Sequence, residues 1–427
     1  MFHRLFNFLN KRDFFPYYIC TPLIYSIGNA SEHIYTAAAY AKRKRKKILI
    51  FKINFFQKFL KNNICNNELF DSLILNNQNE DRGVFYHLTN FFIQIEFVFR
   101  RFLAIKLKKY LNVDLGESFR FPLLGSRDLY STKKIIEFSS ITPLSTNECV
   151  ADLKTYKKDE CLRILEKYGV KDKKFVCLHV RDNSYHNDLG RREYRNSNIN
   201  NYIELINFLI EKGYYVFRLG DKPAPKINYS NKNFFDLPYS ELKSEIMDLF
   251  LIKECSFYVG TISGTMDTSY LFKKPTFLTN MYELFPSYPR KIEDRGIFKK
   301  VFDKKRKEYL SIKKFAELSI KYHHCEMDMN DLEFEENSPN ELLEGIMEYY
   351  NLVNSKVDNT SNIILEDAQK NFNIFLTKRL KEIYDFELVK NNYFKDDSWK
   401  KNEFLRIVKR FKSCEGSLNS SYLRKNF

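Results

Sequence analysis

The alternation of apolar and polar positions is clearest between residues 174 and 280. The run KFVCLHV (174–180) is apolar, rich in β-forming residues and followed by polar residues, which predicts a buried strand. Gly213 stands where a glycine commonly ends a helix. The helix itself is predicted from apolar side chains at helical spacing: Tyr202, Leu205, Ile206 and Leu209.

The same alternation continues to residue 280. A small-residue turn, TISGT (261–265), opens a short helix, and Ser240 is predicted to cap an earlier helix that buries Leu242, Ile246, Leu249 and Phe250. Further strands are predicted at YYVFRLG (214–220), NFFDL (233–237), SFYVG (256–260) and PTFLTN (275–280). Strands that alternate with helices predict parallel β/α units in a doubly wound, Rossmann-like sheet.

The N-terminal region repeats this pattern once, with a strand at 17–25, a turn at 26–32 and a second strand at 48–53. A helical stripe lies between them: Ile34, Ala37, Ala38 and Ala41. We therefore predict an α/β fold with two Rossmann-like domains that face a cleft. The predicted ranges are 14–155, 156–350 and, for a helical C-terminal extension and tail, 351–427.

Composition narrows the class of protein only in part. The 70 Lys and Arg against 54 Asp and Glu give a net charge of +16, which predicts an anionic partner without naming it. Because the chain is also rich in Asn, Ile, Phe and Tyr, as proteins of AT-rich genomes are, we give this charge little weight. The N-terminus lacks the apolar core of a signal peptide, and no window reaches about 18 apolar residues. We expect a cytoplasmic protein that is soluble or peripheral on the inner face of the cytoplasmic membrane.

Disulfide and metal chemistry find little support in the residue pattern. The eight cysteines are scattered without a C-x-x-C pair, so we expect reduced thiols, with Cys177 and Cys255 buried. The chain has no D-x-D and no H-E-x-x-H motif. His323, His324 and Cys325 are contiguous and therefore point in different directions. We predict chemistry that needs neither a metal nor a cofactor.

The first candidate for chemistry is His179-Val180-Arg181-Asp182, directly after the strand 174–180. In a doubly wound fold this is the end of the sheet where ligands bind. An arginine offers a fixed charge and two parallel donors for phosphate oxygens, and a histidine beside it can donate to the same phosphate. The structural alternative, a surface Arg181–Asp182 pair beside a buried imidazole, is equally supported by these residues alone.

Three blocks in this order make the region more specific: HVRDNSYHND, then YRNSNINNYIELINFLIEKGYYVFRLGD, then YVGTISGTMDTSYLFKKPTFLTN. Together they resemble a family of bacterial glycosyltransferases from surface-polysaccharide gene clusters. More distantly, the H-x-R loop is similar to that of fucosyltransferase-like enzymes of the GT-B fold, in which the corresponding arginine contacts the diphosphate of the donor. The resemblance covers about 175–280.

The resemblance implies that Arg181 binds the donor phosphates, with His179, Asp182 and Tyr185 beside it. The other donor-binding candidates that it implies are Tyr194, Arg195, Asn196, Arg218, Gly220 and Asp221. A core role for Arg218 is the alternative; a charge inside a strand needs a partner, and Asp221 is the nearest in sequence.

The turn at 261–265 is a candidate anion cradle. Its small hydroxyls, its glycine and the free N–H groups of the following helix suit a phosphate: Thr261, Ser263, Gly264 and Thr265. A plain helix N-cap would use the same residue types, so it is the order after the H-x-R block that favours a role in binding.

The general base is left open among three carboxylate and imidazole groups. Glu32 and His33 fall in the first predicted strand-to-helix turn, with Gly28 and Asn29, where an acceptor hydroxyl would be deprotonated. Asn29 and Glu32 also fit a capping box, and we favour that structural interpretation. Asp182 is the third candidate.

Two basic clusters remain. The run 42–47 stands at the end of the first helix, where cations are favourable and usually solvated. The region 85–112 is predicted to be a basic helix with apolar residues interleaved, and it suits either an anionic membrane surface or ordinary core packing equally well.

The preferred hypothesis is a metal-independent, inverting glycosyltransferase that moves a sugar from a nucleotide-sugar donor to a surface glycan or lipid-linked acceptor. A nucleotide-sugar 2-epimerase of the same fold is the second hypothesis. A non-catalytic nucleic-acid or anion binder is the third, and the lack of any motif of that class argues against a nucleic-acid partner.

Overall fold

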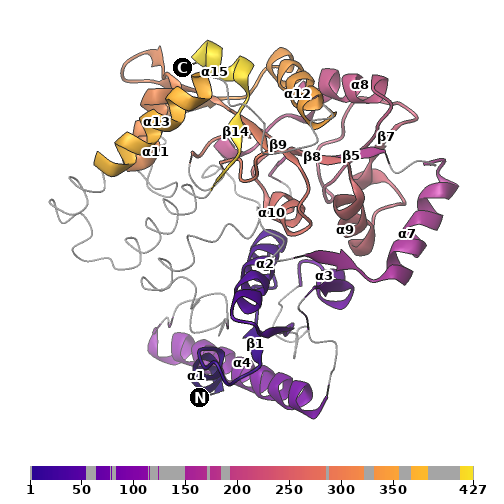
Figure 1. Ribbon diagram of the computed structural model, residues 1–427, viewed down its shortest axis with the longest axis vertical. Helices are drawn as coiled ribbons and strands as arrows, with labels where there is room; N and C mark the ends of the chain where they lie inside the picture. The colour runs from indigo at the N-terminus through magenta and orange to yellow at the C-terminus, as the bar shows by residue number, and fades with distance from the viewer. Residues whose placement is uncertain are drawn as a thin grey trace. The chain divides into compact units, whose positions relative to one another are not determined.

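The computed structural model describes residues 2–53, 64–76, 78, 83–113, 115, 124, 150–170, 174–183, 193–284, 288–321, 331–354, 367–382 and 414–426. Its contacts divide the mixed α/β chain into two compact units (Figure 1). The first unit consists of Met1–Arg163, Glu245–Lys253 and Asp267–Lys273. The second consists of Ile164–Ser244, Glu254–Met266 and Lys274–Phe427.

The second unit contains a seven-stranded sheet in the order β14-β10-β9-β8-β5-β6-β7, and every neighbouring pair is parallel. This confirms the predicted parallel β/α units. The strands are β5 (Phe175–His179), β6 (Tyr215–Arg218), β7 (Phe234–Asp236), β8 (Phe257–Gly260), β9 (Thr276–Met281), β10 (Arg295–Phe298) and β14 (Ser417–Leu418). The helices that connect them are α8 (Ile203–Glu211), α9 (Glu245–Glu254) and α10 (Gly264–Leu271).

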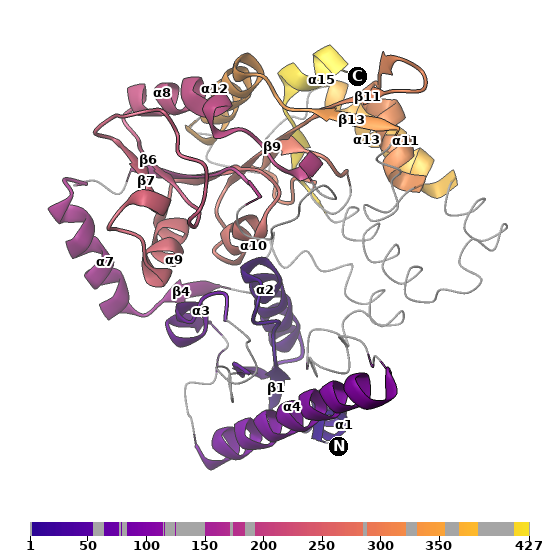
Figure 2. The same ribbon diagram turned by 180° about the vertical axis from the view of Figure 1, so that it is seen from behind.

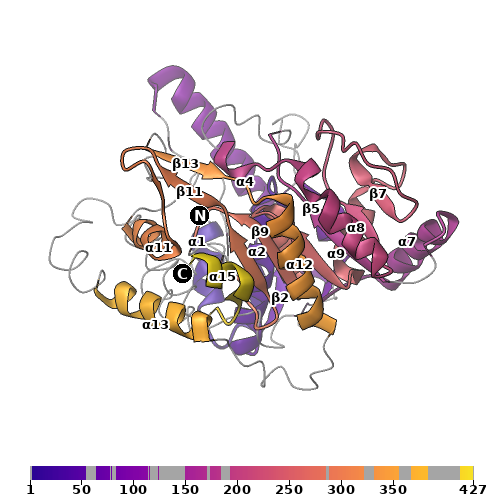
Figure 3. The same ribbon diagram turned by 90° about the horizontal axis from the view of Figure 1, so that it is seen from above.

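The helix predicted around residue 205 is confirmed. Tyr202 ends a short 3₁₀ turn that leads into α8, and Tyr202, Leu205, Ile206 and Leu209 are all buried. Gly213 follows with a φ of 82°, a backbone conformation that glycine adopts at little cost. Helix α8 packs against α12 (Pro339–Asn354), and the two lie together on one face of the sheet (Figures 1 and 3).

Two details of the C-terminal half differ from the predictions. Ser240 does not cap α9, because the helix begins at Glu245; the Ser240 hydroxyl instead accepts from the Leu242 amide at 3.2 Å. Within the range predicted as a helical extension, Ser417 and Leu418 form strand β14, which pairs with β10 at the edge of the sheet.

The second unit also contains a smaller, three-stranded antiparallel sheet (Figure 2). Its strands are β11 (Lys300–Asp303), β12 (Glu308–Tyr309) and β13 (Leu332–Glu335), with β11 in the middle. The remaining described helices of this unit are α11 (Ile312–Lys321), α13 (Asp367–Glu382) and α15 (Ser420–Asn426).

In the first unit, β1 (Tyr17–Cys20) and β2 (Lys47–Ile50) pair in parallel and are joined by α2 (Ile27–Arg43), as the apolar pattern predicts. The unit further contains α1 (Phe2–Asn10), α3 (Glu68–Asp71), the antiparallel pair β3 (Leu73–Leu75) and β4 (Ala151–Leu153), α4 (Val84–Leu111) and the start of α7 (Thr155–Lys167). Helix α4 matches the helix predicted at 85–112.

The turn predicted at 26–32 is wrong. Helix α2 already begins at Ile27, with Ser26 as its N-cap residue, so Asn29 lies inside the helix and cannot cap it. The capping-box interpretation of Asn29 and Glu32 therefore fails. The basic run that follows α2 is also only partly solvated, because Lys46 is buried and its Nζ donates to the backbone oxygens of Asn10 and Arg12 at 2.8 and 2.7 Å.

The described cysteines are free thiols: Cys20, Cys65, Cys161, Cys177, Cys255 and Cys414. Cys177 and Cys255 are buried, as predicted. Cys149 and Cys325 lie outside the described residues.

Candidate functional site

The order in which the chain adds strands to the main sheet reverses between β5 and β8. From β5 the chain continues through β6 to β7 on one side, and then returns to build β8, β9 and β10 on the other side. In doubly wound sheets, ligands bind beyond the carboxyl ends of the strands at such a point. The residues that follow His179 and Gly260 are therefore the first place to look for a site.

Gly260 allows these two strand ends to come close together. It pairs with His179 across the sheet, and a Cβ at position 260 would lie 2.5 Å from the His179 carbonyl oxygen. Just beyond it, the Thr261 amide donates to that same oxygen at 3.0 Å. Any side chain at position 260 would push the two strand ends apart.

Arg181 is fixed at this edge by hydrogen bonds from both its backbone and its side chain. Its amide donates to the Thr261 hydroxyl at 2.9 Å, and its Nη1 donates to the Asn196 side-chain oxygen at 2.5 Å. Its carbonyl accepts from the Ser197 amide at 2.9 Å, and the residue is only 7% exposed. The guanidinium thus occupies one defined position, and the predicted residues Arg181, Asn196 and Thr261 are brought into direct contact.

Two residues that we did not predict hold Asn196 in turn. Its side-chain amide donates to the Asn183 side-chain oxygen, and its backbone oxygen accepts from Lys299 Nζ at 2.6 Å. Burial lowers the pKa of Lys299 to about 8, partly offset by the carboxylate of Glu336. Asn183 stands next to the H-V-R-D motif and could have been chosen from it, whereas no sequence signal connects Lys299 with Arg181.

His179 is a neutral imidazole near pH 7. Burial of the ring, helped by the charge of Arg218 and opposed by that of Asp182, lowers its pKa to about 4. Its buried Nδ1 has no hydrogen-bond partner among the described residues. The ring can therefore donate through one nitrogen or accept through the other, but it adds no positive charge to the site.

The hydroxyls of the 261–265 turn are linked to a strand residue that we did not predict. The Tyr258 hydroxyl lies 2.8 Å from Thr265 Oγ1, and Ser263 Oγ lies 2.9 Å from that same atom. Helix α10 begins at Gly264, so the last two residues of the 261–265 segment already form its first turn. Ser263 and Thr265 are thus held in place beside the first N–H groups of the helix, as an anion cradle requires.

The block around residue 195 packs against an aromatic cluster. The ring of Tyr194 meets the rings of Tyr282 and Phe334 with centroids 5.1 and 5.5 Å apart. The Arg195 guanidinium lies 5.2 Å above the Tyr282 ring, and its buried Nε has no hydrogen-bond partner among the described residues. Tyr185 lies outside the described residues.

Arg218 has a different partner from the one predicted. Its Nη1 donates to the Asp236 carboxylate at 3.1 Å and to the Pro225 carbonyl at 2.8 Å, and the residue is 1% exposed. Asp221 is exposed and pairs instead with Lys243 at 2.9 Å. Gly220 lies in the turn between Arg218 and Asp221 and adopts a φ of 152°, a conformation that glycine tolerates. The described contacts of Arg218 are those of a buried structural ion pair.

The general base stays open. His33 and Glu32 lie on α2 in the first unit. The Nδ1 of His33 accepts from the Leu23 amide at 3.2 Å, so this nitrogen already has a structural role. Asp182 is half-buried, and its charge lies close enough to the His179 ring to act upward on the pKa of His179.

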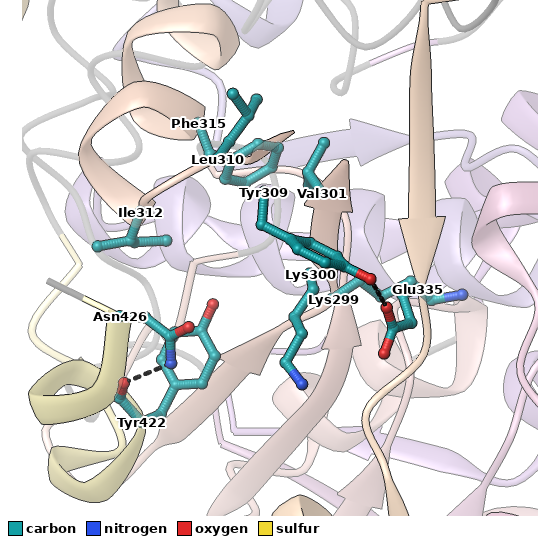
Figure 4. A pocket seen from close by; sticks show the side chains of 10 residues that line it. All are labelled: Lys299, Lys300, Val301, Tyr309, Leu310, Ile312, Phe315, Glu335, Tyr422 and Asn426. Carbon is teal, nitrogen blue, oxygen red and sulfur yellow. Dashed lines mark hydrogen bonds between the residues drawn. The ribbon is translucent and has the colours of Figure 1, made fainter. Parts of the chain in front are cut away.

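A pocket of about 320 Å³ opens beside the antiparallel sheet (Figure 4). It is lined by Lys299, Lys300, Val301, Tyr309, Leu310, Ile312, Phe315, Glu335, Tyr422 and Asn426. The two lysines already have anionic or carbonyl partners: Lys299 the backbone oxygen of Asn196, and Lys300 the Glu341 carboxylate at 3.0 Å. Lys299 therefore supports Asn196 from beside the pocket, and we assign no ligand to the pocket itself.

In the described parts of the chain, no three His, Cys, Asp or Glu side chains lie close enough together to hold a metal ion. His323, His324 and Cys325 fall outside those parts.

Comparison with known proteins adds little. No protein-family model matches the chain, and no curated protein matches it. Among solved structures it is similar to the crystal structure of the glycosyl transferase family 9 from Veillonella parvula DSM 2008, with 9% sequence identity and a TM-score of 0.35. That match covers 62% of this chain and 80% of the other. A likeness this low establishes neither a shared fold nor a shared activity.

Proposed function

We propose that the carboxyl ends of β5 and β8 bind the diphosphate of a nucleotide sugar, and that the chain transfers the sugar to a surface glycan or lipid-linked acceptor. The observation that carries the proposal is the fixed position of Arg181 beyond β5, where the strand order of the sheet reverses. Its hydrogen bonds to Thr261 and Asn196 orient the guanidinium before any ligand arrives.

The electrostatics of this edge suit a diphosphate leaving group. When a sugar leaves its donor, negative charge develops on the phosphate, and pre-oriented donors stabilise that charge most effectively. Arg181 supplies a permanent positive charge on a planar guanidinium, whose Nη1 is oriented by its hydrogen bond to Asn196. Helix α10 begins at Gly264, so the positive end of its dipole lies at the 261–265 turn.

Two groups with different charge states would then meet the donor. Arg181 is charged at every relevant pH, whereas His179 is neutral and can donate one hydrogen bond without adding charge. We infer that Arg181 neutralises the phosphates and that His179 helps to orient them. Because Arg218 is already paired with Asp236, we assign it a structural role and no contact with the donor.

The sugar-nucleotide part of the proposal comes from the resemblance of the three blocks at 179–188, 194–221 and 258–280 to surface-polysaccharide glycosyltransferases. Transfer to a hydroxyl also needs a base, for which Glu32, His33 and Asp182 remain the candidates. With a fixed arginine charge at the phosphates, we expect transfer to be metal-independent and to continue in the presence of EDTA.

Product analysis tests the proposal. The purified chain would be incubated with UDP-, GDP- and CMP-sugars, with and without a membrane extract that supplies acceptors, and with EDTA throughout. We expect release of one nucleotide by the wild type, a large loss in Arg181→Gln, and wild-type activity in Arg163→Gln, an exposed arginine on α7. Conversion of the donor sugar without any acceptor would instead support the epimerase, and no turnover of any donor would contradict both.

A further inference from the structure

Helix α4 exposes an apolar stripe on the side opposite its core contacts. Its inner side packs into the core of the first unit, where Ile93 and Phe97 are almost fully buried. Its outer side carries six apolar residues that are between 41% and 76% exposed: Val84, Leu88, Phe91, Ile95, Phe99 and Phe102. These six residues are called the α4 stripe below.

The spacing of the stripe makes it one continuous surface. Successive members are three or four residues apart, and Lys106 and Lys109 continue the same spacing. At 100° per residue these eight positions fall within an arc of about 80°, and the apolar part extends over about 27 Å. The core-packing alternative therefore accounts for the inner side of α4 and leaves the stripe unexplained.

The exposed charged side chains on the outer side of α4 are all positive. Glu96 is the single acidic side chain of α4; it is 7% exposed and accepts from Arg100 Nη2 at 2.6 Å and from the His3 amide at 2.6 Å. The exposed basic side chains Lys106, Lys108 and Lys109 follow the apolar stripe at its C-terminal end. The outer side of the helix thus combines large apolar groups with positive charge and no exposed carboxylate.

We propose that the α4 stripe binds an anionic lipid surface, with the helix lying in the interface. Exposed phenylalanines gain by entering the boundary between head groups and acyl chains, and adjacent lysines gain from anionic head groups. In the described part of the chain, no helix is long and apolar enough to cross a membrane.

A second copy of the chain fits the stripe less well. In an antiparallel pair of α4 helices centred near Glu96, Lys106 and Lys109 would lie over the apolar start of the other helix, and in a parallel pair over the other copy's lysines. Neither arrangement gives these lysines a carboxylate partner, whereas an anionic bilayer satisfies both the apolar and the charged groups.

Co-sedimentation with vesicles tests the proposal on the full chain. Vesicles of phosphatidylcholine alone would be compared with vesicles that also contain phosphatidylglycerol. Two double variants test the stripe. The phenylalanine pair combines Phe99→Gln with Phe102→Gln, and the lysine pair combines Lys106→Glu with Lys109→Glu. The control pairs are Tyr156→Gln with Ile374→Gln, both exposed, and Lys167→Glu with Lys232→Glu, which changes net charge by the same amount.

We expect wild type to bind the anionic vesicles and to be released by salt. The lysine pair should reduce binding by about 30-fold or more, the phenylalanine pair by about 10-fold or more, and the control pairs by less than about twofold. Thermal unfolding would confirm that each variant is folded, as substitution of exposed residues should allow.

Several results would overturn the proposal. Wild type could fail to bind anionic vesicles, or both stripe variants could bind as wild type does. Sedimentation without lipid could also show a wild-type dimer that the Phe99→Gln, Phe102→Gln variant converts to a monomer, which would assign the stripe to a second copy. The proposal does not depend on the proposed function: Arg181→Gln should bind vesicles as wild type does, even if no donor is ever turned over.

Discussion

The carboxyl ends of β5 and β6 lie side by side in the main sheet, and each is associated with a buried arginine. At the end of β6, Arg218 donates to a carboxylate, that of Asp236. Two residues beyond β5, Arg181 donates to the amide oxygen of Asn196 and is anchored through its backbone to Thr261. Arg218 and Arg181 are thus both buried arginines at the carboxyl end of a strand. Among the described contacts, a carboxylate partner distinguishes the arginine that we assign to the fold from the arginine, held by an amide oxygen, that we propose binds a ligand.

Removing the carboxylate at the β6 end should have the largest effect on stability. Asp236→Asn leaves the Arg218 charge buried without its counterion, so we expect the free energy of unfolding to fall by about 3–5 kcal/mol. Denaturant unfolding measures this. Asp221→Asn is the matched control, because its pair with Lys243 is exposed and should contribute about 0–1 kcal/mol. Equal losses in the two variants would show that the Arg218 pair is not the structural one.

Placing a carboxylate at the β5 end should make Arg181 resemble Arg218. In Asn196→Asp the new charge faces Arg181 Nη1, where it would compete with a bound phosphate. We expect nucleotide affinity to fall by about 1–3 kcal/mol, that is by roughly 5- to 150-fold, while loss of the hydrogen bond to Asn183 costs only about 1 kcal/mol of stability. Isothermal titration calorimetry and thermal unfolding measure the two quantities. Unchanged affinity would argue against a phosphate at Arg181.

The smallest expected effect concerns His179 and pH. Its folded pKa of about 4 lies below the reference value of 6.5, so the unfolded chain binds the proton more tightly. The contribution of the neutral ring is present above pH 6.5 and is lost as the pH falls towards 4. Wild type should therefore lose about 1–2 kcal/mol more than His179→Gln over this range. An imidazole resonance of His179 that titrates near 6.5 would contradict the assignment.

Most of the main sheet could be predicted because its strands are apolar runs and its helices have clear stripes. The start of α2 could not, because Ser26, Gly28 and Asn29 are typical turn residues, yet they belong to a helix that begins at Ile27. Strand β14 has only two residues in a polar tail, which is too short for any periodicity. The predicted domain boundaries and the cleft between the domains stay predictions.

The site could be predicted only where its partners are close in sequence or belong to the resembled blocks. The group formed by Arg181, Asn196 and Thr261 comes from these blocks, and the structure places its members in contact. The partner of Arg218 could not be predicted, because the parallel register of β6 and β7, which sets Asp236 opposite Arg218, is a tertiary feature. The contact between Lys299 and Asn196 could not be predicted for the same reason, because the two residues are far apart in sequence.

Nucleotide binding by wild type and Arg181→Gln tests the central claim most directly. Both proteins, with Arg163→Gln as control, would be titrated calorimetrically with nucleoside diphosphates and CMP. We predict that one nucleotide binds wild type and the control equally, and that Arg181→Gln binds it more weakly by about 1.5–3 kcal/mol while remaining folded. Equal affinity of wild type and Arg181→Gln for that nucleotide, or no binding of any nucleotide to folded wild type, would contradict the account.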